Sequence, residues 1–549
     1  MNDRQRDTTL LEVEGLRIEA VSRSGGGAVL VDNASFSLKR GEVLGLIGES
    51  GAGKSTIGLS SMNYTRAGCA ITGGRILFDG KDILALSERE GRALRGAKIA
   101  YIAQSAAASF NPSLTIGRQV CEVAIRHKLL GKAAAKARAV ALFRSLELPD
   151  PETFGNRYPH QASGGQLQRA MAAMAMMAEP DLLVFDEPTT ALDVTTQVEV
   201  LAAFRKLIRE RGTAALYITH DLAVVAQIAD RIMVLRHGKT VEAGDAEDIL
   251  QNPQEDYTRR LVAERNAAMA GRFVEDKKDG EQPVLQLEAL TASYSGLARA
   301  IEDVSMDLKR GDTLAIVGES GSGKSTLARV VVGLLPRESG RIVFKGEDLP
   351  PALGQRSRDT LRRIQMIYQI PDLALNPKQT LLEIIGRPIE FYLGKSRQEV
   401  RARVVELLRQ IELPESYLMR RPPELSGGQK QRVCIARALA AEPDIVICDE
   451  VVSALDPLVA EEILGLLRRL QETLGLAYLF ITHDLSTVRR IANKVAVMRK
   501  GEVVAYGETS EIFSPPYHPY TELLLSSVPE MRFDWLDGVL QTREQISKA

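Results

Sequence analysis

The feature that most constrains this chain is a pair of Gly-rich loops with identical spacing. GESGAGKS occupies Gly48 to Ser55, and GESGSGKS occupies Gly318 to Ser325, so both fit the pattern G-x-x-x-x-G-K-S. An apolar run precedes each loop and a helix-like stretch follows it, which is the order of a phosphate-binding loop. One chance match is expected in about 2% of chains of this length, so two copies indicate two such loops.

The residue types of these loops suit the binding of a nucleoside triphosphate. Glycines let successive backbone N–H groups turn toward one phosphate, and the N-terminus of the following helix adds partial positive charge. Lys54 and Lys324 are placed to reach the β- and γ-phosphates. Ser55 and Ser325 offer hydroxyls to a Mg²⁺ ion that bridges the phosphates. The sequence therefore predicts two nucleotide sites in one chain.

The same ordered set of short motifs follows each loop. It comprises a glutamine, a Ser-Gly-Gly-Gln turn, an apolar strand that ends in Asp-Glu, an Ala-Leu-Asp turn and a histidine. The first set is Gln104, Ser163 to Gln166, Asp186 and Glu187, Ala191 to Asp193, and His220; the second is Gln369, Ser426 to Gln429, Asp449 and Glu450, Ala454 to Asp456, and His483. From the serine to the strand-end aspartate both halves count 23 residues, and from the aspartate to the histidine both count 34. The two halves of the chain therefore repeat the same motifs in the same order and at the same spacing.

On these motifs the chain resembles the ATP-binding-cassette ATPases, and the resemblance covers nearly the whole sequence. Strand-like runs surround each motif, and Ala-, Arg-, Glu- and Leu-rich segments lie between the glutamine and the Ser-Gly-Gly turn. Together they predict an α/β fold with two tandem nucleotide-binding domains, each with a parallel-sheet core, an antiparallel β subdomain and an α-helical subdomain.

We predict that residues 1–264 form the first domain and residues 284–549 the second, each with a C-terminal extension. Residues 265–283 are charged, contain Gly and Pro, and are expected to be a linker. Fully extended, these nineteen residues span about 60 Å, whereas the radius of gyration of a 250-residue domain is about 18 Å. The linker is long enough for the two domains to meet face to face.

The resemblance implies that each ATP lies between the phosphate loop of one half and the Ser-Gly-Gly turn of the other. A helix N-terminus at that turn would hold the γ-phosphate. The nucleotide-binding residues implied are Gly48, Ser50, Gly51, Gly53, Lys54, Ser55, Thr56, Ser163, Gly164, Gly165, Gln166 and Tyr294, together with Gly318, Ser320, Gly321, Gly323, Lys324, Ser325, Thr326, Ser426, Gly427, Gly428 and Gln429.

Catalytic and metal-binding roles follow from the same resemblance. Mg²⁺ is expected at two sets of side chains: Ser55, Gln104 and Asp186 in the first half, and Ser325, Gln369 and Asp449 in the second. Glu187 and Glu450 are expected to polarise the attacking water, and His220 and His483 to hydrogen-bond the γ-phosphate. Because both halves keep the glutamate, we predict two hydrolytic sites.

One difference between the halves concerns the adenine. Aligning Leu11 with Leu285 places Ala20 opposite Tyr294, so only the second half offers an aromatic ring at this position. Stacking of a base on an aromatic ring contributes about 1–3 kcal/mol. We therefore expect the first site to hold ATP more weakly, with strand packing as the alternative role of Tyr294.

Composition excludes several other classes of protein. Lys and Arg number 70 and Asp and Glu 71, so no net positive charge favours nucleic acid. The apolar stretch from Ala170 to Ala178 is about half as long as a membrane helix, and residues 1–9 are charged and lack the apolar core of a secretory signal. The four cysteines form no C-x-x-C pair, so we expect neither zinc nor an iron–sulfur cluster.

Further motifs suggest what the ATPase drives. An Asn-Pro pair follows each of the two glutamines, at Asn111 and Asn376, and each half ends in a segment with Pro and Tyr, residues 252–258 and 515–521. In these features the chain resembles the ATPases of oligopeptide, dipeptide and nickel importers, and as a fused pair the Yej-type peptide importers. That resemblance implies two separate membrane permease subunits, a periplasmic substrate-binding protein, one copy of this chain per transporter, and a peripheral position on the cytoplasmic side of the bacterial inner membrane.

Alternatives remain at this stage. A tandem-cassette translation factor would act on ribosomes, although such proteins carry a long charged helical arm between the cassettes, and the linker here is short. An importer for a nickel chelate or another non-peptide would use the same motifs. Chromosome or repair machinery would bring a coiled coil or a zinc module, neither of which the sequence indicates.

Overall fold

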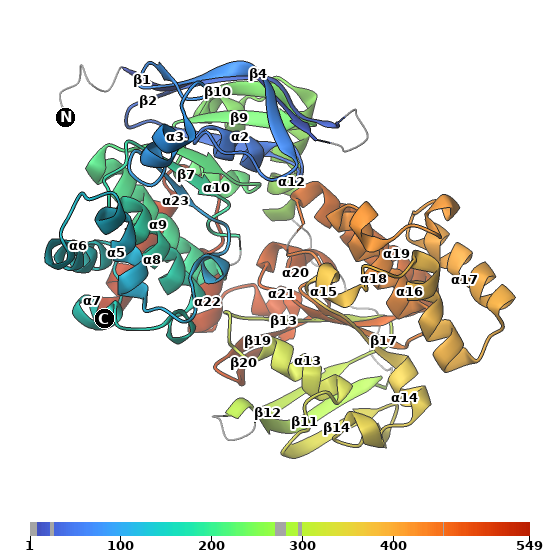
Figure 1. Ribbon diagram of the computed structural model, residues 1–549. Coiled ribbons are helices and arrows are strands. Elements are labelled where there is room, and N and C mark those ends of the chain that lie inside the picture. The colour runs from blue at the N-terminus through green and yellow to red at the C-terminus, as the bar shows by residue number, and fades with distance from the viewer. Residues whose placement is uncertain are drawn as a thin grey trace. The chain divides into compact units, whose positions relative to one another are not determined.

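The computed structural model describes residues 8–21, 27–190, 192–269, 282–294, 299–453 and 455–548. The chain forms two compact units (Figure 1). The first comprises Met1–Arg265 and Pro529–Ala549, and the second comprises Asn266–Val528. Each is described below by itself.

The first unit contains two sheets and a group of helices. A four-stranded antiparallel sheet has the order β2-β1-β4-β5, and a six-stranded sheet has the order β10-β9-β3-β8-β7-β6. The strands are β1 (Thr9–Ala20), β2 (Val29–Lys39), β3 (Val43–Gly48), β4 (Cys69–Phe78), β5 (Lys81–Asp82), β6 (Ile99–Ile102), β7 (Leu182–Asp186), β8 (Ala214–Ile218), β9 (Arg231–Arg236) and β10 (Lys239–Asp245). The helices are α2 (Lys54–Ser60), α3 (Glu88–Leu94), α4 (Ala106–Ser109), α5 (Ile116–Arg126), α6 (Lys132–Ser145), α7 (Pro151–Phe154), η1 (Pro159–Gln161), α8 (Gly164–Met176), α9 (Val194–Arg211), α10 (Leu222–Ala226), α11 (Ala246–Gln251), α12 (Asp256–Met269) and α23 (Trp535–Lys548).

The second unit repeats this plan. Its sheets have the orders β12-β11-β14-β15 and β16-β17-β18-β13-β19-β20. The strands are β11 (Leu285–Ser293), β12 (Arg299–Leu308), β13 (Thr313–Val317), β14 (Ser339–Phe344), β15 (Glu347–Asp348), β16 (Ile364–Ile367), β17 (Ile445–Asp449), β18 (Ala477–Ile481), β19 (Lys494–Arg499) and β20 (Glu502–Glu508). The helices are α13 (Lys324–Val332), η2 (Leu353–Gln355), α14 (Arg358–Arg363), α15 (Pro371–Ala374), α16 (Leu381–Pro388), η3 (Ile389–Leu393), α17 (Arg397–Gln410), η4 (Glu415–Tyr417), η5 (Pro422–Glu424), α18 (Gly427–Leu439), α19 (Pro457–Leu474), α20 (Leu485–Ile491), α21 (Thr509–Ile512) and α22 (Pro519–Ser526).

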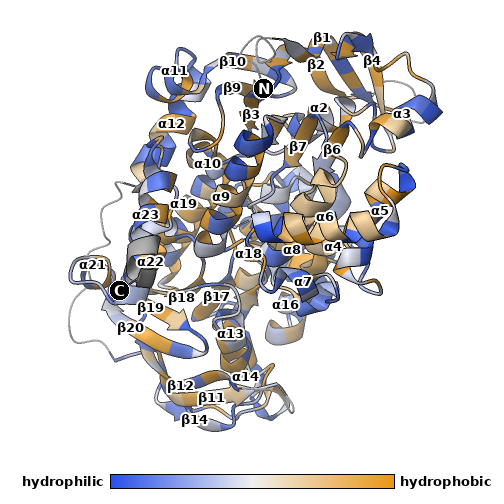
Figure 2. Cartoon of the chain, turned by 90° about the vertical axis from the view of Figure 1, so that its left-hand side faces the viewer, coloured by the Kyte–Doolittle hydropathy of each residue, from blue (hydrophilic) through white to orange (hydrophobic). Residues whose placement is uncertain are grey.

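The six-stranded sheets form the cores that carry the motifs. Every residue of β3, β7, β8, β13, β17 and β18 is buried. Parallel strands covered on both faces are apolar throughout instead of alternating, and Figure 2 shows this apolar character in orange along β7. The predicted α/β fold, with its parallel core, antiparallel β subdomain and helical subdomain, is confirmed in both units.

Two features differ from the predicted division of the chain. Residues 265–269 of the expected linker continue helix α12, and residues 270–281 lie outside the described part of the chain. We expected residues 529–549 to belong with the second half, but they pack on the first unit, where Trp535 and Leu536 are at most 2% exposed. Burial of these side chains against the first unit is the physical reason for the difference.

Candidate functional site

Each phosphate loop joins a buried strand to a helix. In the first unit β3 ends at Gly48 and α2 begins at Lys54, and in the second β13 ends at Val317 and α13 begins at Lys324. Gly48 has φ of +151°, and a Cβ there would lie 2.0 Å from the carbonyl oxygen of Leu235. No other residue fits so close to the neighbouring strand β9, so glycine fixes the direction in which the loop leaves the sheet.

The loop lysines are buried and held by backbone carbonyls. Nζ of Lys54 donates to the carbonyl oxygens of Gly48 at 2.6 Å and Glu49 at 2.9 Å. Nζ of Lys324 donates to the corresponding carbonyl oxygens of Gly318 and Glu319 at 2.8 and 2.7 Å. An ammonium group is costly to bury unless it is hydrogen-bonded. These contacts hold the ammonium group inside the loop, where it is placed to bind an anionic phosphate group.

A hydroxyl and a carboxylate meet beside each loop. Oγ of Ser55 donates to Oδ1 of Asp186 at 2.7 Å, and Oγ of Ser325 donates to Oδ1 of Asp449 at 3.0 Å. Each aspartate ends a fully buried strand, which fixes its position. Burial raises the pKa of Asp449, and the negative charge of Glu450 adds to this effect although the hydrogen bond from Ser325 opposes it. Hard oxygen ligands from two rigid elements fit a Mg²⁺ ion.

In the first unit, two further side chains contact the strand-end aspartate. The hydroxyl of Tyr101 donates to Oδ2 of Asp186 at 2.5 Å, and Nη2 of Arg66 lies 3.9 Å from the same oxygen. Sequence reasoning missed both. The available signal was the aromatic residue three positions before Gln104, because Met366 stands three positions before Gln369.

The glutamates that follow these aspartates have left-handed backbone conformations. Glu187 has φ of 48° and Glu450 has φ of 52°, a region that non-glycine residues seldom occupy. Their N–H groups donate to the carbonyl oxygens of Ile218 at 2.8 Å and Ile481 at 2.9 Å. The same backbone conformation and the same hydrogen bond therefore place the glutamate after the strand in both units.

A glutamine and a histidine contact each of these carboxylates. In the first unit Nε2 of Gln104 donates to Oε2 of Glu187 at 3.0 Å, and Nδ1 of His220 lies 3.5 Å from Oε1. In the second unit Gln369 donates to Glu450, and Nδ1 of His483 lies 3.5 Å from Oε1. The glutamines were expected near Mg²⁺, and their amide groups contact the glutamates in this structure.

Charge balance keeps both glutamates ionised. Burial raises the pKa of Glu187, but the interaction with His220 and the charge of Lys54 outweigh burial, so the pKa lies below its ordinary value. The same opposition, with His483 in place of His220, lowers the pKa of Glu450. Burial lowers the pKa of His483, and the Glu450 carboxylate raises it by more. A carboxylate of this kind is able to accept a hydrogen bond from water.

The Ser-Gly-Gly turns begin long helices that are largely buried, but the first residues of each helix lie at the surface. Ser163 caps α8 and Ser426 caps α18, and each serine side chain accepts the N–H of the glutamine three residues later. Each serine and the glycine that follows it are exposed. A helix N-terminus whose first residues are exposed carries the positive end of the helix dipole and suits an anion.

The structure thus brings together, within each unit, the loop lysine and serine, the glutamine, the Asp-Glu pair and the histidine. Each Ser-Gly-Gly turn lies at the N-terminus of helix α8 or α18. Tyr294 follows β11, where its hydroxyl accepts from Nη1 of Arg329 at 3.0 Å and lies 3.4 Å from Oγ1 of Thr326. Ala191 and Ala454 of the predicted Ala-Leu-Asp turns lie outside the described residues.

Comparison with known proteins agrees with this arrangement. The model of the ABC transporter family matches residues 31–190 and 301–453, which contain the phosphate loop and the Asp-Glu pair of each unit. The chain belongs to the ABC transporter family. As members of this family, its two cassettes are ATP-binding, ATP-hydrolysing domains. A second model, the C-terminal region of oligopeptide/dipeptide transporters, matches residues 504–548.

Curated relatives of this ABC chain cover almost its full length. The glutathione import ATP-binding protein GsiA of Escherichia coli O157:H7 and that of Escherichia coli strain K12 are each 40% identical to it over 559 aligned residues. Each alignment covers 95% of this chain and 89% of the relative. Among solved structures, cbiO1 from Clostridium perfringens, part of an ABC transporter complex, is 32% identical over 43% of this chain and 92% of its own, with a TM-score of 0.39.

Proposed function

We propose that this chain is the ATP-hydrolysing subunit of a bacterial importer that takes up peptides through separate membrane subunits. The observation that carries this proposal is the match of residues 504–548 to the C-terminal region of oligopeptide/dipeptide transporters. The 40% identity to proteins named for glutathione import supports it, because glutathione is itself a short peptide. The more specific assignment to the Yej type stays a prediction.

Two composite ATP sites form part of the proposal. The first combines the loop, Asp-Glu pair and histidine of the first half with Ser426, Gly427 and Gly428; the second combines those of the second half with Ser163, Gly164 and Gly165. The exposed, capped helix N-termini at these turns support the assignment, because a helix N-terminus binds an anionic phosphate.

Within each site the side chains have separate tasks. Lys54 and Lys324 bind the β- and γ-phosphates. Glu187 and Glu450 accept a hydrogen bond from the attacking water and orient it, while His220 and His483 donate to the γ-phosphate. When bound, Mg²⁺ neutralises charge on the phosphates, and the residues that would hold it are Ser55 with Asp186 and Ser325 with Asp449; Gln104 and Gln369 are proposed as further ligands. We propose no zinc or iron–sulfur site.

The proposed partners are two membrane permease subunits and a periplasmic substrate-binding protein, with one copy of this chain per transporter and no nucleic acid. In the part of the chain that the structure describes, no helix combines the length and apolar character needed to cross a membrane. We propose a peripheral position on the cytoplasmic side of the inner membrane, held there by the permease subunits.

Uptake by a gene-deletion strain tests the proposal. Labelled glutathione, a tripeptide, a pentapeptide and a nickel chelate are offered in turn, with complementation by the normal gene or by the Glu187→Gln, Glu450→Gln double variant. We expect only the normal gene to restore uptake of at least one peptide. Restored uptake of nickel alone would overturn the peptide assignment, and recovery of the tagged chain with ribosomes instead of membrane proteins would overturn the transporter role.

A further inference from the structure

One face of the C-terminal helix α23 is buried in the first unit, although the helix follows the second half in sequence. In Figure 1 it is the red helix beside α9. Trp535, Leu536 and Val539 are 2%, 0% and 7% exposed. They belong to one apolar cluster with Val198 of α9 and Val224 of α10. The segment is therefore packed against the two helices that follow the Ala-Leu-Asp turn and the histidine of the first site.

A single buried amide fixes this segment to helix α10. Nε2 of Gln227, at the C-terminal end of α10, donates to the carbonyl oxygens of Glu530 at 2.9 Å and Arg532 at 2.6 Å. Its Oε1 accepts the N–H of Leu536 at 3.1 Å. Gln227 is only 3% exposed, so water does not replace these bonds. Helix α10 begins two residues after His220.

An arginine links the same segment to the other end of α10. Nη2 of Arg265 donates to the carbonyl oxygen of Pro529 at 2.9 Å, and its Nε lies 3.6 Å from Oδ1 of Asp221. Asp221 caps α10 by accepting the N–H of Ala223 at 2.9 Å, and it directly follows His220. The C-terminal segment thus contacts the C-terminal end of α10 directly, through Gln227, and its N-terminal end through Arg265, and α10 is the helix that follows the histidine.

Two contacts reach helix α9. Nη1 and Nη2 of Arg543 approach the carbonyl oxygen of Thr195 at 3.4 and 3.5 Å, and Arg205 forms an ion pair with Asp537. The hydroxyl of Thr195 donates to Oδ1 of Asp193 at 2.8 Å. Asp193 caps α9 and ends the Ala-Leu-Asp turn. Thr195 therefore connects this turn with Arg543 of the C-terminal segment.

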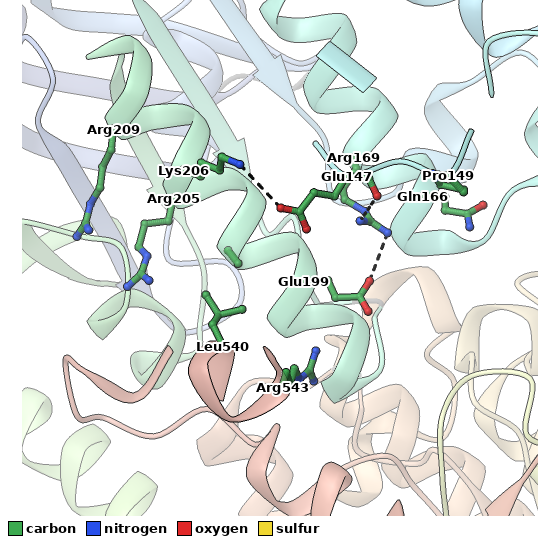
Figure 3. Close-up of a pocket in the computed structure, with 11 residues that line it drawn as sticks. Glu147, Pro149, Gln166, Arg169, Glu199, Arg205, Lys206, Arg209, Leu540 and Arg543 are labelled. Atoms are coloured by element: carbon green, nitrogen blue, oxygen red, sulfur yellow. Dashed lines mark hydrogen bonds and ion pairs between the residues drawn. The ribbon is translucent and has the colours of Figure 1, made fainter. Parts of the chain in front are cut away.

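A pocket of about 840 Å³ separates α23 from the Ser-Gly-Gly helix α8. Figure 3 shows Leu540 and Arg543 of α23 on one side, with Gln166 and Arg169 of α8 among the other lining residues. Across it Nη2 of Arg169 pairs with Glu199 of α9 at 3.3 Å. The segment therefore contacts α9 and α10 closely and faces α8 across open space.

The second half differs at the corresponding positions. The constant spacing of the motifs pairs Gln227 with Arg490 and Arg265 with Val528. Arg490 forms an ion pair with Glu461 of its own unit, and a valine side chain has no group that could replace the guanidinium of Arg265. The sequence thus confines this hydrogen-bonded link to the first half.

We propose that the segment Pro529–Arg543 is a positioning element for the first ATP site. It fixes α10 and the beginning of α9, and through them His220 and Asp193, so hydrolysis at the first site depends on a segment that follows the second half. This inference rests on the proposed role of His220. Gln227 and Arg265 are positioning residues, because they act through α10 and do not themselves reach the phosphate loop.

Site-specific kinetics on the full chain test the proposal. Gln227→Met removes three hydrogen bonds at nearly constant volume, and Arg490→Met is the matched control in the second half. Each is placed in a Glu450→Gln chain, in which only the first site hydrolyses, and in a Glu187→Gln chain, in which only the second does. We expect Gln227→Met to lower kcat of the first site about tenfold or more, with KM for ATP unchanged, and to leave the second site unaffected.

Equal losses at both sites, or no loss at the first, would overturn the inference. A rise of KM without a fall of kcat would also overturn it, because positioning of the histidine acts on the chemical step. If Glu187→Gln itself leaves ATP hydrolysis at full rate, the proposed function fails instead, so the two failures are distinguishable.

Trp535 supplies a separate readout, because it is the only tryptophan in the chain and is buried. Its fluorescence should shift to longer wavelength in Gln227→Met and remain unchanged in Arg490→Met. Should Gln227→Met not fold, Asp537→Arg replaces it, since the Asp537 side chain is 56% exposed. Adding Arg205→Asp should then restore both kcat and the emission wavelength. A shift of the emission to longer wavelength together with a retained first-site kcat would contradict the proposal.

Discussion

The two halves of this chain carry the same motifs at the same spacing, but different residues support those motifs. In the first half Asp186 contacts Tyr101, and the helix after His220 is held by the C-terminal segment. In the second half Met366 stands in the place of Tyr101, and Tyr294 offers an aromatic ring. The comparison teaches that the two halves carry the same site residues in different surroundings. The two sites therefore need to be measured separately.

The largest expected effect concerns the two glutamates that we propose as catalytic. Removal of a general base costs about 10²- to 10⁴-fold, so Glu187→Gln and Glu450→Gln should each silence one site and lower total ATP hydrolysis. The double variant should lose at least about a hundredfold. Steady-state phosphate release from the purified chain measures this. Full ATPase activity in either single variant would contradict the prediction of two hydrolytic sites.

The next effect concerns stability of the first unit alone. Trp535→Ala removes a buried aromatic side chain, and such a change costs about 3–5 kcal/mol. Calorimetry should show a lower melting temperature for the first unit, while the transition of the second unit stays in place. Phe533→Ala, at a residue that is 37% exposed, is the matched control and should change little. A shift of the second unit's transition instead would contradict the assignment of the segment.

Adenine binding should distinguish the sites more modestly. Tyr294→Ala should weaken nucleotide binding at the second site by about 1–3 kcal/mol, whereas Tyr294→Phe should retain the stacking. Binding of a fluorescent ATP analogue to chains with Lys54→Ala, which leaves only the second loop intact, provides the measurement. Equal affinity for the ATP analogue with and without Tyr294→Ala would contradict stacking and favour the alternative role of Tyr294 in strand packing.

The smallest effect is a difference in thiol reactivity. Cys69 and Cys121 of the first half are partly exposed, whereas Cys434 and Cys448 of the second are buried. Burial raises the pKa of Cys434 to about 11, so at pH 8 this thiol is almost entirely protonated and unreactive, and its reactivity grows as the pH approaches 11. Labelling of the native chain at pH 8, followed by peptide mapping, should modify first-half cysteines only. Rapid labelling of Cys434 would contradict its burial.

The sequence predicted the fold of each unit well, because local signals determine it. Fully apolar runs before Lys54 and Asp186 predicted the buried strands, and glycines at fixed offsets predicted the turns. The order of the motifs then placed the lysine, serine, aspartate, glutamate and histidine of each unit side by side. These groups all lie at the ends of neighbouring parallel strands, which sequence order specifies.

The packing of the C-terminal segment was not predictable in this way. Gln227 and Leu536 are 309 residues apart, and the hydrogen bond between them joins a side-chain amide to the backbone, which leaves no pattern in the sequence. The contact of Tyr101 with Asp186 is similar, because strand β6 pairs with β7 only in the folded sheet. The roles of the site residues stay predictions, as does the linker assignment of residues 270–281, which lie outside the described part of the chain.

The central proposal is that each ATP lies between the loop of one half and the Ser-Gly-Gly turn of the other. In a Glu450→Gln chain only the first site hydrolyses, and Ser163→Ala and Ser426→Ala remove the same helix cap in different halves. We predict that phosphate release in this chain falls sharply with Ser426→Ala and hardly changes with Ser163→Ala. A loss with Ser163→Ala and none with Ser426→Ala would contradict the account.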